Sequence, residues 1–184
     1  HNDLLAGSVS GRAGLVSMVR ELRGQLGPCA DPHAAYLLLR GLKSFPARMA
    51  QHNRSAQAIA EWLEDHASVE RVYYPGLASH PHHELAARTM KGYGGVVTFL
   101  HRGDFAATHA LCDACELFQI GASLGGAESM LHPPAVFSYW DLPPAERASL
   151  GMHDNLIRLA VGLEDPEDLI ADLDQALRCA FSAT

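Results

Sequence analysis

An arginine lies in the middle of an apolar run near the end of the chain. Arg158 stands within Leu156–Val161, where its neighbours are Ile157 and Leu159. A permanent charge in such a run needs an anionic partner, because an unpaired buried charge is very costly. A guanidinium gives two parallel hydrogen bonds to a carboxylate, a geometry that lysine cannot provide. The sequence leaves three possibilities open: a protein carboxylate such as Glu128 or Glu164, an outward direction on an alternating strand, or a bound carboxylate ligand.

A glycine-containing segment offers a second group for the same chemistry. Ser123 is followed by Gly125 and Gly126, and glycine lets the backbone approach a ligand closely because it has no Cβ. The Ser123 hydroxyl could add a hydrogen bond to a carboxylate held by Arg158. A simple turn with a capping serine remains the alternative.

The periodicity of apolar residues predicts the elements that must position these groups. One domain, or a small domain with part of another, fits the 184 residues. Helices are expected over 12–26, 31–42, 46–64, 80–90, 104–115 and 166–181, and strands over 69–74, 95–100, 117–120 and 156–162. This order predicts an α+β fold in which helices cover one face of a small sheet. The stretch 121–155 has no clear period, and such long irregular segments usually carry function.

Composition and charge exclude several classes of protein. The formal net charge is −7 and no run rich in Lys or Arg occurs, so no nucleic-acid partner is expected. No apolar run approaches the ~18 residues of a membrane span, so no membrane partner is expected. The four cysteines are too sparse for a disulfide framework, which favours a reduced protein in the cytoplasm. The single CxxC pair and the clustered histidines give no convincing ligand set, so no metal site is expected.

Several segments match one family of enzymes in register along the whole chain. They are HNDLLAG at 1–7, AAYLLLRGLK at 34–43, VYYPGL at 72–77, KGYGG at 91–95, SLGGAES at 123–129 and LIRLAVGLED at 156–165. These segments resemble the pyridoxal-phosphate (PLP) enzymes of cysteine and methionine metabolism. The resemblance implies the C-terminal region of a fold-type I PLP-dependent transferase, α/β overall in the parent. Residues 1–45 would form the edge of the large PLP-binding domain with the start of the connector, and 46–184 the C-terminal small domain.

The resemblance also implies where the chemistry lies. The cofactor would be pyridoxal 5'-phosphate, and the lysine that holds it as a Schiff base would precede His1 on a missing N-terminal segment. No catalytic residue is therefore expected on this chain, and no cofactor-binding residue is assigned. Lys43 and Lys91 lack the Ser/Thr-rich lead-in of such a lysine. Arg158 and Ser123 would bind the carboxylate of a small amino-acid substrate.

The implied activity is transsulfuration at the β or γ carbon of a sulfur or activated-homoserine amino acid, of the cystathionine γ-synthase or γ-lyase type. Elimination and replacement both remain open. Ala122 stands where some members carry a glutamate that contacts the distal amino group of cystathionine, which favours a smaller or less polar substrate side chain. Tyr139, within a run similar to plant cystathionine γ-synthases, could line the substrate entrance or pack in the core.

The family also implies a homo-oligomer, a dimer of dimers whose active sites are shared across a dimer interface. Two alternatives remain for this chain. One is a non-catalytic truncated or fusion module used for oligomerisation. The other is a C–S lyase domain of a larger biosynthetic assembly.

Overall fold

The computed structural model describes residues 1–182, and its contacts divide the chain into two units, His1–Pro46 and Ala47–Thr184. The division falls one residue from the boundary expected from the sequence. That these units are the edge of a large domain and a complete small domain remains a prediction. None of the helices within residues 1–182 is long and apolar enough to cross a membrane.

The first unit consists of helix α1 (Ala13–Leu26) and the beginning of helix α2 (Pro32–Glu64). Helix α1 ends at Gly27, whose φ of 82° is the left-handed conformation that favours glycine at a helix C-terminus. Asp31 caps the N-terminus of α2, because its carboxylate accepts the N–H groups of His33 (2.8 Å) and Ala34 (3.1 Å). No residue of α1 is buried within this unit.

The prediction of separate helices over 31–42 and 46–64 is wrong, because α2 continues through Pro46. An internal proline removes one backbone donor and usually kinks or breaks a helix. Ser44, two residues before this proline, lies inside the helix, and its hydroxyl donates back to the carbonyl of Gly41 (3.4 Å). Bonds of this kind are common for a serine within a helix.

The second unit contains a mixed five-stranded sheet. Its strands are β1 (Val69–Tyr73), β2 (Val96–His101), β3 (Gln119–Ile120), β4 (Met130–His132) and β5 (Leu156–Ala160). They lie in the order β1-β2-β5-β4-β3, antiparallel except for the parallel pair β3 and β4. Four strands were predicted, whereas β4 was not. Its three residues are too short to show alternation and are followed at once by two prolines.

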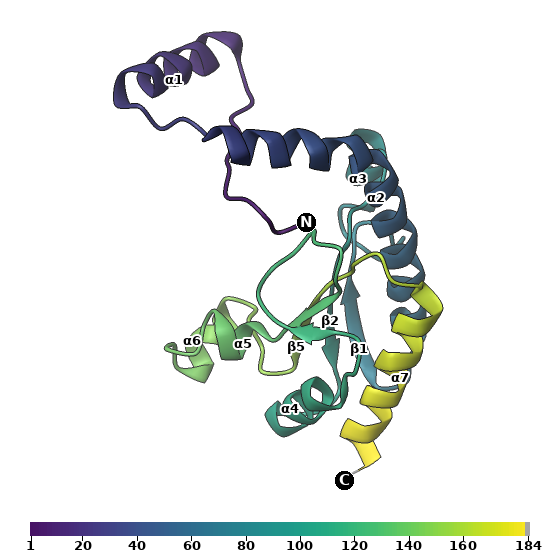
Figure 1. Ribbon diagram of the computed structural model, residues 1–184. Helices are drawn as coiled ribbons and strands as arrows, with labels where there is room; N and C mark the ends of the chain where they lie inside the picture. Colours follow the sequence, from purple (N-terminus) through teal and green to yellow (C-terminus); the bar gives the residue numbers. More distant parts are fainter. Residues whose placement is uncertain (183–184) are drawn as a thin grey trace. The chain divides into compact units, whose positions relative to one another are not determined.

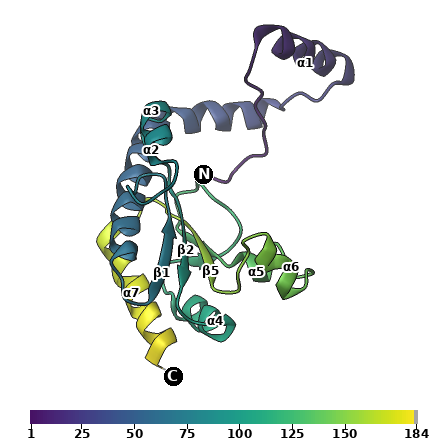
Figure 2. The same ribbon diagram turned by 180° about the vertical axis from the view of Figure 1, so that it is seen from behind.

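Helices lie on both sides of this sheet. The remaining helices are α3 (His83–Thr89), α4 (Phe105–Ala114), α5 (Pro134–Phe137), α6 (Pro144–Ser149) and α7 (Pro166–Ser182). The second half of α2 lies with α7 on one side of the strands, while α5 and α6 lie on the opposite side (Figures 1 and 2). The expected α+β fold is therefore confirmed. The expectation that helices cover only one face of the sheet is wrong, because the short helices α5 and α6, which the sequence did not predict, lie on the other side.

The hydrophobic core fills the side of the sheet that α2, α4 and α7 cover. Val97 and Phe99 from β2 share it with Ile157 and Leu159 from β5. Each of these strands alternates, so that the intervening residues Thr98 and Arg158 belong to the other face. The face that carries Arg158 is thus the face opposite the main core.

Candidate functional site

Arg158 lies in the middle of a row of polar residues on the face of the sheet opposite the main core. On β5 it pairs with Thr98 of β2 on one side and with His132 of β4 on the other. Side chains of directly opposite residues share a face and lie close together. Burial of the flanking Ile157 and Leu159 on the core face determines the direction of Arg158, because successive strand residues alternate.

The guanidinium of Arg158 contacts the two loop residues that the sequence singled out. Its Nη2 donates hydrogen bonds to the carbonyl oxygens of Ala122 (2.9 Å) and Ser123 (3.2 Å). Ser123 therefore meets the arginine through its backbone, whereas a role of its hydroxyl stays a prediction. The structure brings Arg158, Ala122 and Ser123 together from positions more than thirty residues apart.

The alternative that Arg158 pairs with a protein carboxylate is wrong for the part of the chain described. Within residues 1–182 it forms no ion pair with Glu128 or Glu164. Its Nε is buried and has no hydrogen-bond partner among these residues. A buried donor without a partner is rare in proteins and calls for an acceptor. Because no carboxylate among these residues neutralises the charge of Arg158, the site is suited to an anion such as a carboxylate.

Glu164 anchors the loop instead of pairing with Arg158. Its carboxylate accepts both the N–H (2.8 Å) and the hydroxyl (2.8 Å) of Ser129, whose Oγ in turn accepts the N–H of Gly162 (2.8 Å). A Cβ on Gly162 would lie 2.2 Å from the carbonyl oxygen of Ala127, so only glycine fits this approach. These bonds tie the end of the 121–129 loop to the end of β5, beside Arg158.

His132 is a member of the site that sequence reasoning missed. It is 4% exposed, its Nε2 lies 3.1 Å from the Ser138 hydroxyl, and its Nδ1 is buried without a partner among residues 1–182. Burial, and secondarily the charge of Arg158, lower the pKa of His132. No sequence signal marked it, because strand β4 itself was not recognised.

Tyr139 follows helix α5, in the same segment as Ser138. Its backbone N–H donates to the carbonyl of Pro134 (3.1 Å), and its side chain is half-buried. Within residues 1–182 its side chain makes no hydrogen bond to Arg158. Its role at the substrate entrance stays a prediction.

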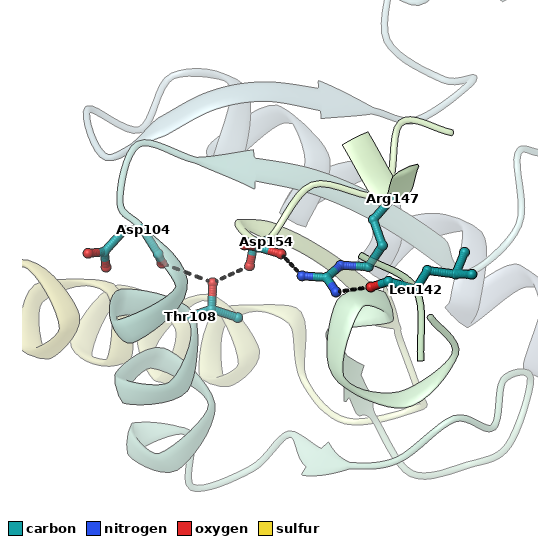
Figure 3. Close-up of polar contacts among 5 residues, drawn as sticks. All are labelled: Asp104, Thr108, Leu142, Arg147 and Asp154. Carbon is teal, nitrogen blue, oxygen red and sulfur yellow. Dashed lines mark hydrogen bonds and ion pairs between the residues drawn. The ribbon is translucent and has the colours of Figure 1, made fainter. Parts of the chain in front are cut away.

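A second buried arginine fastens the segment that leads into β5 (Figure 3). Arg147 donates from Nη2 to the Asp154 carboxylate (2.6 Å) and from Nη1 to the Leu142 carbonyl (2.7 Å). The Asp154 carbonyl accepts the hydroxyl of Thr108 on α4 (2.7 Å). This network connects the 142–154 segment to the N-terminal turn of α4 and so supports the segment that carries Ser138 and Tyr139.

The thiols and lysines take no evident part in the site. Burial raises the pKa of Cys112 to about 11 and that of Cys115 to about 12, so both stay protonated at neutral pH. No group of three metal-binding side chains occurs among the described residues. Lys43 and Lys91 are both exposed, which is unlike the enclosed lysine that a PLP site requires.

Comparisons with known proteins identify the family of the chain. Residues 1–178 match the family model described as Cys/Met metabolism PLP-dependent enzyme. The chain is 50% identical to the chloroplastic cystathionine gamma-synthase 1 of Arabidopsis thaliana over 96% of this chain and 31% of that protein. It is 44% identical to cystathionine gamma-lyase of Mus musculus over 98% of this chain and 46% of that protein.

Solved structures give the same result. Cystathionine gamma synthase from Xanthomonas oryzae pv. oryzae, in complex with aminoacrylate and cysteine or with cystathionine, superposes with a TM-score of 0.86. The identity is 40%, over 94% of this chain and 45% of the solved chain. The chain thus spans 31% to 46% of the length of these relatives. A family match over nearly its whole length means that the chain belongs to the PLP-dependent enzymes of cysteine and methionine metabolism.

Proposed function

We propose that this chain is the C-terminal part of a PLP-dependent transsulfuration enzyme and supplies the clamp for the substrate α-carboxylate. The observation that carries the proposal is the charge of Arg158, a half-buried residue without a carboxylate partner among residues 1–182, on the face of the sheet opposite the main core. The relatives named above are synthases and lyases of cystathionine. The enzyme would act at the β or γ carbon of a sulfur or activated-homoserine amino acid.

The chain's own residues would bind and orient the amino acid. When bound, PLP supplies the electron sink for bond breaking next to the α-carbon. Arg158 Nη1 makes no hydrogen bond with residues 1–182 and is not buried, so a ligand reaches it first. A two-point grip on a carboxylate also needs Nη2, whose contact with Ser123, at 3.2 Å, is the longer and hence weaker of its two. The substrate would share or displace this contact.

Ala122 bears on the substrate side chain. Its methyl group is exposed on the loop while its carbonyl oxygen is held by Arg158. A small apolar residue there offers no charge to a distal amino group, which favours a substrate with a shorter or less polar side chain than cystathionine. The four free cysteines fit a reducing compartment, and we place the complete enzyme in the cytoplasm as a dimer of dimers.

The test of the clamp is Arg158→Lys in the complete protein, with L-cystathionine as the probe substrate. Lysine keeps the charge but loses the planar fork. We expect KM to rise about tenfold or more, since a hydrogen bond to a charged group contributes about 1.5–3 kcal/mol. Inhibition by L-alanine and by L-alaninamide should be compared, because only the former carries a carboxylate.

Wild-type protein should prefer alanine over its amide, and Arg158→Lys should lose most of that preference. Arg88→Lys, on the exposed helix α3, is the matched control and should behave as wild type. An unchanged preference in Arg158→Lys would assign carboxylate binding to another residue and overturn the proposal.

A further inference from the structure

Two buried polar atoms without partners lie on neighbouring strands of the site. Only three buried side-chain nitrogens lack a hydrogen-bond partner among residues 1–182, and two of them are Arg158 Nε and His132 Nδ1. The third belongs to Arg147, whose two terminal nitrogens are both occupied. An unsatisfied buried donor or acceptor costs about 1–3 kcal/mol, so two of them side by side require an explanation.

The two residues are directly paired across the sheet. His132 on β4 lies opposite Arg158 on β5 in the antiparallel register. Residues in such a pair have Cβ atoms about 4.5–5.5 Å apart on one face, well within the reach of an imidazole and an arginine stem. The Nε–H of arginine is always a donor and never an acceptor. The Nε–H of Arg158 therefore needs a hydrogen-bond acceptor, and the facing imidazole can supply a lone pair.

The surroundings of His132 favour a lone pair on Nδ1. Its Nε2 is 3.1 Å from the Ser138 hydroxyl, which can accept the proton of the Nε2–H tautomer. A neighbouring positive charge favours the tautomer whose lone pair faces it. Burial and the charge of Arg158 lower the pKa of His132, which keeps the ring neutral and the lone pair available. The ring also lies against Phe137 (centroids 5.3 Å apart), which restricts its orientation.

We infer that His132 is a positioning residue for Arg158, with one buried water accepting the Nε–H of the guanidinium and donating a hydrogen bond to Nδ1 of His132. The inference rests on the proposed carboxylate clamp. Nε would be held by His132 through this water, and Nη2 is held by the carbonyls of Ala122 and Ser123. The guanidinium plane is then fixed from two sides, and its Nη1 end is directed at the substrate. Such orientation before binding lowers the ordering cost of the complex.

Two substitutions separate the roles of the two ring nitrogens. His132→Asn keeps an acceptor near the place of Nδ1 but loses the reach to Ser138, whereas His132→Gln reaches Ser138 and leaves nothing at Nδ1. In the complete protein we expect His132→Gln to raise KM for L-cystathionine about three- to tenfold, the effect of about one hydrogen bond. The preference for L-alanine over L-alaninamide should fall by a similar factor, with kcat nearly unchanged, while His132→Asn stays near wild type.

His153, an exposed histidine shortly before β5, gives the matched control. His153→Gln should change neither KM nor the preference for L-alanine over L-alaninamide. The order of the Asn and Gln variants decides the question, because a role in packing alone would lower thermal stability without changing the preference for the carboxylate. Equal losses in both variants, or the reverse order, would overturn the inference. If Arg158→Lys loses the preference while His132→Gln keeps it, the clamp stands and only the role of His132 fails.

Discussion

At the scale of single residues, burial on this sheet sets both charge and orientation. His101 at the end of β2 is fully buried, and its Nε2 lies 2.8 Å from the Thr108 hydroxyl. The N–H of Gly103 donates to Nδ1 (3.1 Å), so the proton of the neutral ring is on Nε2. Burial lowers the pKa of His101 to about 4, although Asp104 acts in the opposite direction. His101 is therefore uncharged in the folded protein at neutral pH.

This histidine should make the protein less stable in mild acid. Because its unfolded pKa is about 6.5 and its folded pKa about 4, the unfolded state binds more protons between these values. Stability is therefore full above about pH 6.5 and falls as the pH drops toward 4, by about 2–3 kcal/mol. Urea unfolding of the complete protein at pH 7 and pH 4.5 should show this loss. His101→Gln should reduce the pH dependence, and the exposed His109→Gln should not; equal slopes in all three proteins would contradict the assignment.

At the scale of elements, loops are held by carboxylates rather than by apolar packing. Asp172 on α7 accepts the N–H groups of Glu116 (2.8 Å), Leu117 (2.9 Å) and Phe118 (3.1 Å), directly before β3. Burial alone would raise the pKa of Asp172, but these donors outweigh it and lower the pKa. The start of the 121–129 loop is thereby fixed through β3, and its end is fixed by Glu164.

Glu164→Gln should loosen the loop that carries Ala122 and Ser123. Glutamine keeps one acceptor oxygen, so one of the two bonds from Ser129 is lost. We expect a loss of about 1–3 kcal/mol of stability in urea unfolding and a higher KM for L-cystathionine. Glu167→Gln, exposed on the next helix, is the control and should match wild type. A stable variant with normal KM would mean that the loop does not depend on this anchor.

At the scale of the whole molecule, the first unit depends on contacts beyond itself. Helix α1 buries none of its residues, and Leu15, Leu22 and Leu26 are each more than half exposed. The curated relatives are two to three times as long as the chain that matches them, which leaves room for the segment that bears the cofactor lysine. We expect this segment, in the complete protein, to cover the apolar side of α1.

Intact mass measured before and after borohydride reduction with PLP tests whether the complete protein carries a segment with the cofactor lysine. A polypeptide heavier than the 19.8 kDa of this chain that gains a reduced-cofactor adduct would carry the lysine. A 19.8 kDa species without an adduct would support a non-catalytic module and contradict the enzyme proposal. Adduct formation on the 184 residues alone would instead assign the cofactor to Lys43 or Lys91.

The sequence by itself determined the elements with strong periodicity and the family. Short apolar runs at 95–100 and 156–162 were enough to predict β2 and β5, and the single charge inside the second run singled out Arg158. Such patterns lie within short segments, so they can be recognised in the sequence without knowledge of the tertiary structure. That Gly125 and Gly126 let the backbone approach a ligand stays a prediction.

Only the tertiary structure decided the partners. Strand β4 has too few residues for a period, so His132 could be placed beside Arg158 only through its pairing with β5. Glu164 was a possible partner of Arg158 in the sequence, but its carboxylate turned out to accept Ser129. Hydrogen bonds between residues thirty or more positions apart leave no periodic trace, because they depend on which strands become neighbours. The sequence thus predicted the arginine, and the sheet decided which groups orient it.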